Sequence, residues 1–152
     1  MIYYEPVNLK QWNLFKKVSG PGHIEPFLAT SSMQIGDTIL LHVGSQDKQY
    51  KSGIYAVGTV VHGPYILKDH PQDYCNGKNT VDVKIIKIVY GHPMITFEEF
   101  KKYTRQFRTV HKIDAKWYSE IKPKFTGIIS NYFLPLMPMG SCRTGSMFPS
   151  AV

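Results

Sequence analysis

The chain has 152 residues, of which 43% are hydrophobic, and a formal net charge of +7 at pH 7. This length and composition predict one globular domain with a full hydrophobic core. No apolar run approaches the roughly 20 residues of a membrane-spanning helix, the opening MIYYEPVNLK lacks the pattern of a signal peptide, and the two cysteines form no metal-binding or disulfide pattern. We therefore expect a cytoplasmic protein without membrane association, metal or cofactor.

The first elements that the sequence predicts are a strand and a helix. Ile2–Tyr4 has the composition of a short strand. The stretch NLKQWNLFKK predicts a helix capped by Asn8, with Gln11 at the capping-box position. The apolar residues of this helix recur at intervals of three and predict its buried stripe: Leu9, Trp12 and Phe15. Residues 23–32, HIEPFLATSS, are expected to be irregular.

A turn and two strands follow. Gly36 and Asp37 predict a tight turn before a strand at 38–43, whose alternate residues lie on opposite faces. Residues 53–62 predict a second strand, and the economical pairing of two strands so close in sequence is antiparallel. At Gly58 this second strand has no side chain, which indicates that a helix or a ligand lies close to its backbone, and we favour a helix.

The middle of the chain predicts a long loop and a third strand. Residues 63–80 contain prolines, glycines and an Asn-Gly pair, which are typical of a surface loop. The strand VDVKIIKIVY (81–90) alternates between apolar and polar residues until Ile85 and Ile86, where the pattern changes face. Such a change indicates a β-bulge.

The last part of the domain predicts helices. Thr96 and Glu99 have capping-box spacing and start a helix with three aromatic residues, Phe97, Phe100 and Tyr103. Asp114 is expected to cap another helix, and residues 126–130 to form a short strand or a buried turn. Interleaved strands and segregated helices predict an α+β domain over residues 1–130 with a small, strongly curved sheet. From Asn131 the composition changes, so residues 131–152 are expected to be a poorly ordered Pro/Met/Ser-rich tail or a contact for another chain.

Catalytic motifs are absent from the sequence. It contains no GxxxxGK[ST], GxGxxG or HExxH pattern, and no serine in a nucleophile elbow. His70 and Cys75 lie in the predicted loop, but two ligands are too few for a zinc site. We therefore assign no catalytic and no metal-binding residue.

Positive charge is concentrated in one segment. Eight Lys and Arg residues but only two acidic residues lie between Lys101 and Lys124. Two interpretations remain open, a solvated helix surface and an edge that contacts nucleic-acid phosphates. Four residues of this segment are the candidates for phosphate binding: Lys101, Lys102, Arg105 and Lys112.

Aromatic residues suggest a slot for a flat ring, because every nucleobase has a π face that stacks on an aromatic side chain. Four of them are the candidate walls: Tyr3, Tyr4, Phe27 and Tyr55. Three polar residues of the run QFRTVHKI are the candidates for reading the edge of a base: Gln106, Arg108 and Thr109. In the alternative interpretation these are ordinary core and surface residues. His42, in the middle of a strand, is expected to be a hydrogen-bonded core histidine.

The stretch IGDTILLHVG…SGIYAVGTVVHGPYIL resembles the signature of EVE domains, members of the PUA-like superfamily related to YTH domains. The likeness rests on Gly36 with Asp37, on Gly53-Ile54-Tyr55-Ala56, on Gly58 and Val60, and on Pro64. It covers roughly residues 2–121. The chain has Tyr3-Tyr4 where many EVE domains have a tyrosine-tryptophan pair, Phe27 where they often have a tryptophan, and Thr109 in place of their late turn.

The resemblance implies a curved mixed sheet that closes toward a small barrel, flanked by helices, with a pocket for one base flipped out of DNA or RNA. Family members are regarded as readers of modified bases, including methylated cytosine and adenine. The function expected on this basis is that of a non-enzymatic nucleic-acid-binding module. Two alternatives stay open: a PUA-like hydrolase of modified nucleosides, using Lys84 or His111 with Asp82, and a structural or interaction domain.

Overall fold

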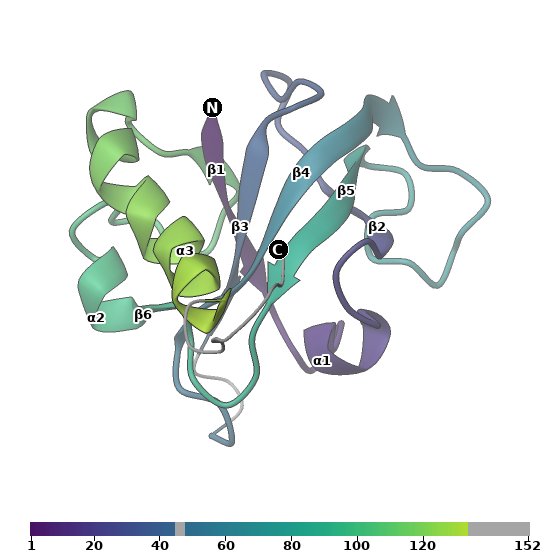
Figure 1. The fold of residues 1–152 in the computed structure, drawn as a ribbon. Helices are drawn as coiled ribbons and strands as arrows, with labels where there is room; N and C mark the ends of the chain where they lie inside the picture. Colours follow the sequence, from purple (N-terminus) through teal and green to yellow (C-terminus); the bar gives the residue numbers. More distant parts are fainter. Residues whose placement is uncertain (45–47, 134–152) are drawn as a thin grey trace. The chain divides into compact units, whose positions relative to one another are not determined.

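The computed structural model describes residues 1–44 and 48–133, and its main feature is a seven-stranded sheet (Figure 1). The chain divides into two compact units, with the boundary after Tyr118. The strands are β1 (Ile2–Val7), β2 (Ile24–Leu28), β3 (Thr38–Val43), β4 (Gly53–Ile66), β5 (Asn79–Ile88), β6 (Ile95–Thr96) and β7 (His111–Lys112). The helices are α1 (Leu14–Lys17), α2 (Phe97–Phe100), a 3-10 turn (Ala115–Trp117) and α3 (Tyr118–Phe133). The predicted α+β class is confirmed.

The strands follow the order β2-β5-β4-β3-β1-β7, and β6 pairs with the start of β4. The β1–β3 pair is parallel, and the other pairs are antiparallel, which makes the sheet mixed. Within the described residues β2 and β7, the two ends of this order, do not pair with each other. The sheet is therefore open, and the expected closure toward a barrel is wrong.

Alternation along β3 places its residues as the sequence predicts. Ile39, Leu41 and Val43 belong to the main hydrophobic core, whereas His42 lies on the opposite face among aromatic rings. β3 and β4 form the expected antiparallel pair. The turn before β3 is also confirmed, since the Asp37 carboxylate accepts hydrogen bonds from the Gln34 amide and the amino terminus.

The element that lies close to the backbone of Gly58 is a neighbouring strand, and not the expected helix or a ligand. A Cβ atom at this position would overlap Val83 Cγ1 and lie 3.0 Å from the Lys84 carbonyl oxygen, both on β5. The register between β4 and β5 shifts here, because Val57 pairs with Lys87 and Gly58 with Ile85. Ile86 is thus the extra residue of a β-bulge, as predicted, and its side chain is 48% exposed.

The first helix begins later than predicted. Asn8 does not cap a helix; its side chain accepts a hydrogen bond from the Lys10 amide in a turn. The cap is Asn13, whose side chain accepts hydrogen bonds from the amides of Phe15 and Lys16. Asparagine is a favourable N-cap residue at either position, and in the structure the second asparagine caps the helix. Leu9 is nevertheless buried, as expected.

Two segments expected to be irregular contain strand. Residues 24–28 form β2, at one end of the sheet order, where Pro26 is tolerated because an edge strand needs no donor on its open side. β4 continues through His62 to Ile66, and β5 begins at Asn79, so the loop between them is shorter than residues 63–80.

The helices at the end of the domain are only partly as expected. The capping box of Thr96 and Glu99 is present, but α2 ends at Phe100 and does not reach Tyr103. Asp114 caps the 3-10 turn that leads into α3. Residues 126–130 lie within α3, so neither a strand nor a turn is correct there. α3 also includes the first three residues of the predicted tail, 131–133, and the rest of that tail lies outside the described residues.

Replacement of Gly58 by alanine should destabilise the protein by about 1–3 kcal/mol, since the added methyl group overpacks the contact with β5. Denaturant unfolding measures this loss. Val83→Ala removes the overlapping methyl group, so it should cost less in the Gly58→Ala background than in the wild type. Wild-type stability of Gly58→Ala would contradict the close approach of β5.

Candidate functional site

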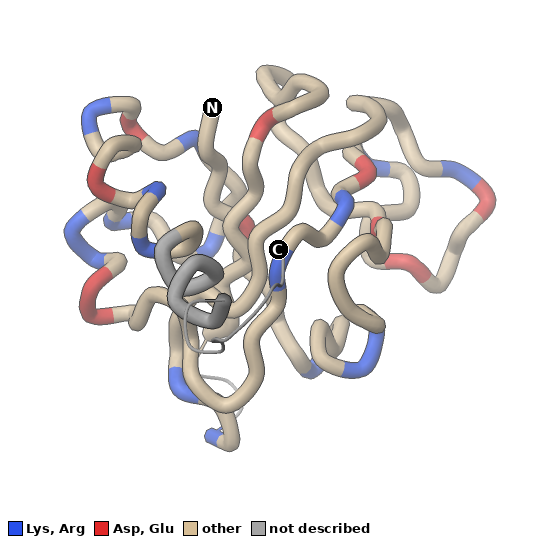
Figure 2. The backbone as a smooth tube through the Cα atoms, in the orientation of Figure 1, with Lys and Arg blue, Asp and Glu red and all other residues tan. Residues whose placement is uncertain are grey.

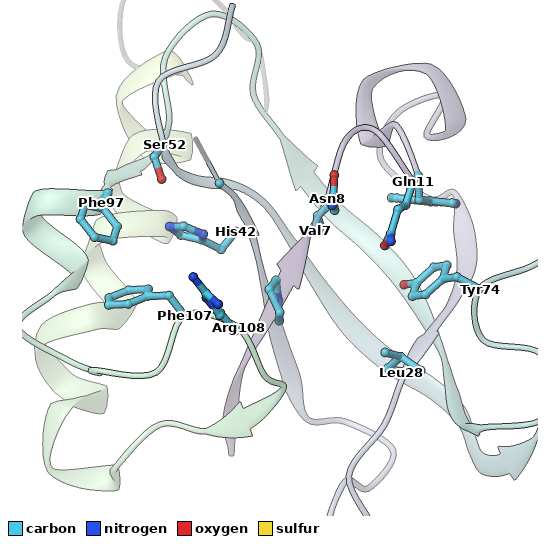
Figure 3. A pocket seen from close by; sticks show the side chains of 13 residues that line it. Val7, Asn8, Gln11, Leu28, His42, Ser52, Tyr74, Phe97, Phe107 and Arg108 are labelled. Carbon is cyan, nitrogen blue, oxygen red and sulfur yellow. The ribbon is translucent and has the colours of Figure 1, made fainter. Parts of the chain in front are cut away.

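A cleft of about 590 Å³ lies at the carboxyl end of β1 and has the size of a small-molecule site. Figure 3 shows two groups of side chains on the two sides of β1. The first group is His42, Phe97, Phe107 and Arg108, and the second is Gln11, Leu28 and Tyr74. Val7 and Asn8 lie between them.

Phe97 and Phe107 form the aromatic wall of the first group. Their ring centroids are 4.8 Å apart, and the planes are inclined by 55°. The capping box fixes the start of α2, and the Phe97 amide donates a hydrogen bond to the Ser52 carbonyl, so Phe97 has a defined place beside the sheet. Phe107 directly precedes Arg108 in the polar run that the sequence singles out, yet neither phenylalanine is among the predicted walls.

Tyr4 supports this wall from behind. Its hydroxyl donates a hydrogen bond of 2.8 Å to the Phe107 carbonyl, across 103 residues of sequence. The Tyr4 ring lies 5.3 Å from the His42 ring and 5.1 Å from the His111 ring. Burial raises the pKa of Tyr4 further above neutral pH, so its hydroxyl stays a donor even in alkaline solution. Tyr4 is fully buried and does not line the cleft, so it holds the wall rather than forming it.

His42 is the polar group at the base of this wall. The side chain is buried, and its Nε2 atom has no hydrogen-bond partner among the described residues. His42 is thus a core histidine, as expected, but the expected hydrogen bonding is missing at Nε2. Burial lowers the pKa of His42 to about 4. At neutral pH the uncharged ring has one donor and one acceptor nitrogen.

Pro6 adds a backbone acceptor to the cleft. The Met1 carbonyl accepts a hydrogen bond from β3, and the Ile2 carbonyl accepts one from Ile113 beside β7. The backbone N–H and C=O groups of odd residues of β1 therefore point toward β3, and those of even residues point toward β7. β7 pairs only with Tyr3 and Tyr4. The Pro6 carbonyl therefore points to the side on which β7 has already ended, and Pro6 lines the cleft.

Arg108 is the predicted edge-reading residue that the structure places at the cleft. Its side chain is exposed, and Figure 3 shows its guanidinium group beside His42 and Phe107. Gln106 and Thr109 are exposed and bond to each other at 3.4 Å, outside the cleft lining. His111 shapes this turn, since its two ring nitrogens bond to the Thr104 hydroxyl and the Thr109 carbonyl.

None of the four predicted slot walls lines the cleft: Tyr4 lies behind it, and the other three belong elsewhere. Tyr3, Phe27 and Tyr55 are at most 1% exposed and belong to the main hydrophobic core. The Tyr3 hydroxyl bonds to Ser32 and the Tyr55 hydroxyl to the Lys51 carbonyl, so neither ring end is open to a ligand. The cleft thus has other walls than the slot that the sequence suggests.

The four predicted phosphate-binding residues lie outside the cleft lining. Arg105 and Lys112 are exposed. Lys101 forms an ion pair of 2.8 Å with Glu98, and Lys102 lies 5.5 Å from the centre of the Trp117 ring. Figure 2 shows basic positions along the backbone after α2, with acidic positions among them. These four residues precede or follow Arg108 in the sequence, but none of them lines the cleft.

The catalytic set considered from the sequence is only partly assembled. Asp82 on β5 accepts a hydrogen bond of 2.6 Å from Tyr65 and lies 3.4 Å from His62 Nδ1. His111 belongs to β7, with three strands between it and β5 in the sheet order. The pair of His111 and Asp82 is therefore wrong. Within the described residues no group of three or more His, Cys, Asp or Glu side chains is arranged to hold a metal ion, and no helix is long and apolar enough to cross a membrane.

The burial of His42 should make stability depend on acidity. Its pKa in the folded chain is about 4, below the ordinary value of 6.5. Between these two pH values His42 therefore binds a proton in the unfolded chain but stays mostly uncharged in the folded chain. Stability should therefore fall by about 3 kcal/mol as pH decreases from 6.5 to 4. His42→Gln should lose this part of the slope in urea unfolding across that range, whereas His70→Gln, on an exposed loop, should retain it. Equal slopes in His42→Gln and the wild type would contradict the assignment.

No protein-family model and no curated protein matches the chain. Solved structures share its fold. A hypothetical protein from Leishmania major is 16% identical with a TM-score of 0.53, over 84% of this chain and 96% of that one. The Rpa0253 protein from Rhodopseudomonas palustris is 14% identical (TM-score 0.52; 81% and 91% covered), and the PSPTO5229 protein from Pseudomonas syringae is 13% identical (TM-score 0.54; 82% and 99% covered). At these identities the likeness shows a common small α+β fold alone.

Proposed function

We propose that the chain is a non-enzymatic module that binds DNA or RNA and holds one flipped, modified base in the cleft beside His42. The observation that carries this proposal is His42 Nε2, at the base of an aromatic wall, which has no hydrogen-bond partner among residues 1–44 and 48–133. A buried polar atom without a partner costs about 1–3 kcal/mol. A ligand that supplies the missing hydrogen bond recovers this cost.

The cleft has the chemical groups that a nucleobase needs. Phe97 and Phe107 present aromatic surface, while His42, the Pro6 carbonyl and the Arg108 guanidinium supply hydrogen-bonding groups of different kinds. Flipping a base out of its stack costs a few kcal/mol, and stacking on an aromatic side chain returns about 1–3 kcal/mol per base. Donor and acceptor groups at the base edge supply the remainder and determine which base fits.

A methyl group on the base adds to the binding energy. Burial of one such group contributes about 0.8 kcal/mol, which is roughly a fourfold gain in affinity. This gain requires that the methyl group meets apolar surface, and the two phenylalanine rings provide it. Methylated cytosine or adenine is therefore the class of base that we propose.

Electrostatic attraction supports a polyanionic ligand. Arg108 lies at the cleft, and the segment around it contains six Lys and Arg residues between Lys101 and Lys116 against Asp114 alone. A strand that follows this segment would bring its phosphates near exposed cations. Binding of such a strand becomes weaker as salt increases, because condensed counterions are released.

The test uses single-stranded decanucleotides with one 5-methylcytosine or one N6-methyladenine, and fluorescence anisotropy as the readout. Phe107→Leu keeps the apolar volume but removes the stacking ring, so affinity should fall about tenfold. Arg108→Ala should lower affinity and reduce the slope of log affinity against log salt by about 0.7. Matched controls are Tyr90→Leu, an aromatic residue 58% exposed and outside the cleft, and Lys68→Ala, an exposed residue of the 67–78 loop.

The proposal fails if no oligonucleotide binds at low salt. It also fails if the control variants lose as much affinity as Phe107→Leu and Arg108→Ala, since binding would then be spread over the whole surface.

A further inference from the structure

The cleft continues on the other side of β1 into a second hollow of about 600 Å³. The two hollows share four lining residues: Gln11, Trp12, Leu28 and Tyr74. Figure 3 shows Gln11, Leu28 and Tyr74 across β1 from His42 and Arg108. Each hollow alone lies within the volume range of a small-molecule site, so together they exceed what one nucleobase fills.

The shared residues have the chemistry of a second stacking site. Trp12 packs edge-on against Phe27 of the core, with ring centroids 5.1 Å apart, while its own side chain remains partly exposed at the cleft. Tyr74 is partly buried on the 67–78 loop. The Gln11 amide, which lines both hollows as well, provides both a donor and an acceptor. Two aromatic side chains with a neighbouring amide suit a base stacked without strict sequence readout.

Cations accompany this second hollow. Lys17 and Lys78 line it, and both are exposed. Glu25 and Asp73 also line it, but both are already engaged, Glu25 with His23 at 2.7 Å and Asp73 with the Cys75 amide at 2.8 Å. These hydrogen bonds leave the carboxylates charged, so the two lysines offset them and are the cationic groups of the lining that a phosphate can contact.

We propose that this second hollow takes the nucleotide next to the flipped base, with Trp12 and Tyr74 as stacking surfaces and Lys17 and Lys78 as phosphate contacts. This inference rests on the proposed function and makes it more specific. The ligand is then a strand of at least two nucleotides, not a free nucleobase or nucleoside.

The experiment compares two probes by calorimetry: the modified mononucleotide, and the decanucleotide that contains it. The decanucleotide should bind at least tenfold more tightly to the wild type. Trp12→Leu, which keeps an apolar contact with Phe27, should remove about tenfold of decanucleotide affinity and a smaller share of mononucleotide affinity, because Trp12 also lines the first hollow. Phe107→Leu should weaken both probes.

A second variant does not depend on the core. Lys17→Ala with Lys78→Ala changes only exposed side chains and should reduce the salt slope for the decanucleotide by about 1.4, at about 0.7 per contact. Lys68→Ala, outside both hollows, should leave the slope unchanged. Thermal unfolding of each variant shows whether the fold is intact.

The outcomes separate the two proposals. If both probes bind with equal affinity, or if Trp12→Leu and the lysine variant leave decanucleotide binding unchanged, the second hollow has no such role and the proposed function stands. If neither probe binds at low salt, the proposed function itself is wrong, and the second hollow falls with it.

Discussion

The candidate site depends on the short length of β7. β1 is paired with β3 along its whole length, but β7 pairs with only two of its residues. The Ile2 backbone on that edge is also paired, with Ile113 and the Tyr118 hydroxyl, so Pro6 is the position where backbone groups would stay unpaired, which sheets otherwise avoid. Pro6 stands at the critical place and has no N–H, so only an acceptor remains there. The sheet therefore opens a hollow at its own edge without leaving a donor unpaired.

Two buried polar side chains sit on the strands that line this edge. Glu5 and His42 each have a side-chain atom without a hydrogen-bond partner among the described residues. Burial raises the pKa of Glu5 well above its ordinary value and lowers that of His42. Burial, and to a smaller extent the charge of Glu5, also raises the pKa of Tyr74. Groups of this kind reduce stability, and proteins tend to keep them where they bind or react.

Local sequence signals predicted local structure well. Glycine and aspartate before β3, the capping box of Thr96 and Glu99, and the bulge at Ile86 each involve residues that are close in sequence. The signals were ambiguous where two residues obeyed the same rule, as Asn8 and Asn13 do for the start of α1. β2 was not predicted because it contains Pro26. Proline is unfavourable in a strand unless that strand lies at the edge of a sheet, and the sequence alone does not show which strands are edges.

The site was harder to predict than the fold because distant segments build it. Tyr3 and Phe27 have the same composition signal as the aromatic residues that line the cleft, and only the packing of both sheet faces shows that they are core residues. Phe97 and Phe107 meet His42 through contacts between β3 and segments more than fifty residues later. Arg108, which the sequence marks as a candidate for reading a base edge within the run QFRTVHKI, lines the cleft.

The aromatic wall comes from a segment that is separate from the main core. Phe97 and Phe107 lie between β6 and β7, and neither belongs to the large apolar cluster that holds the sheet together. The sheet can consequently stay constant while this connecting segment varies in sequence. A substitution in this segment can thus change the wall of the cleft without disturbing the packing of the sheet, much as antibody loops vary on a fixed framework.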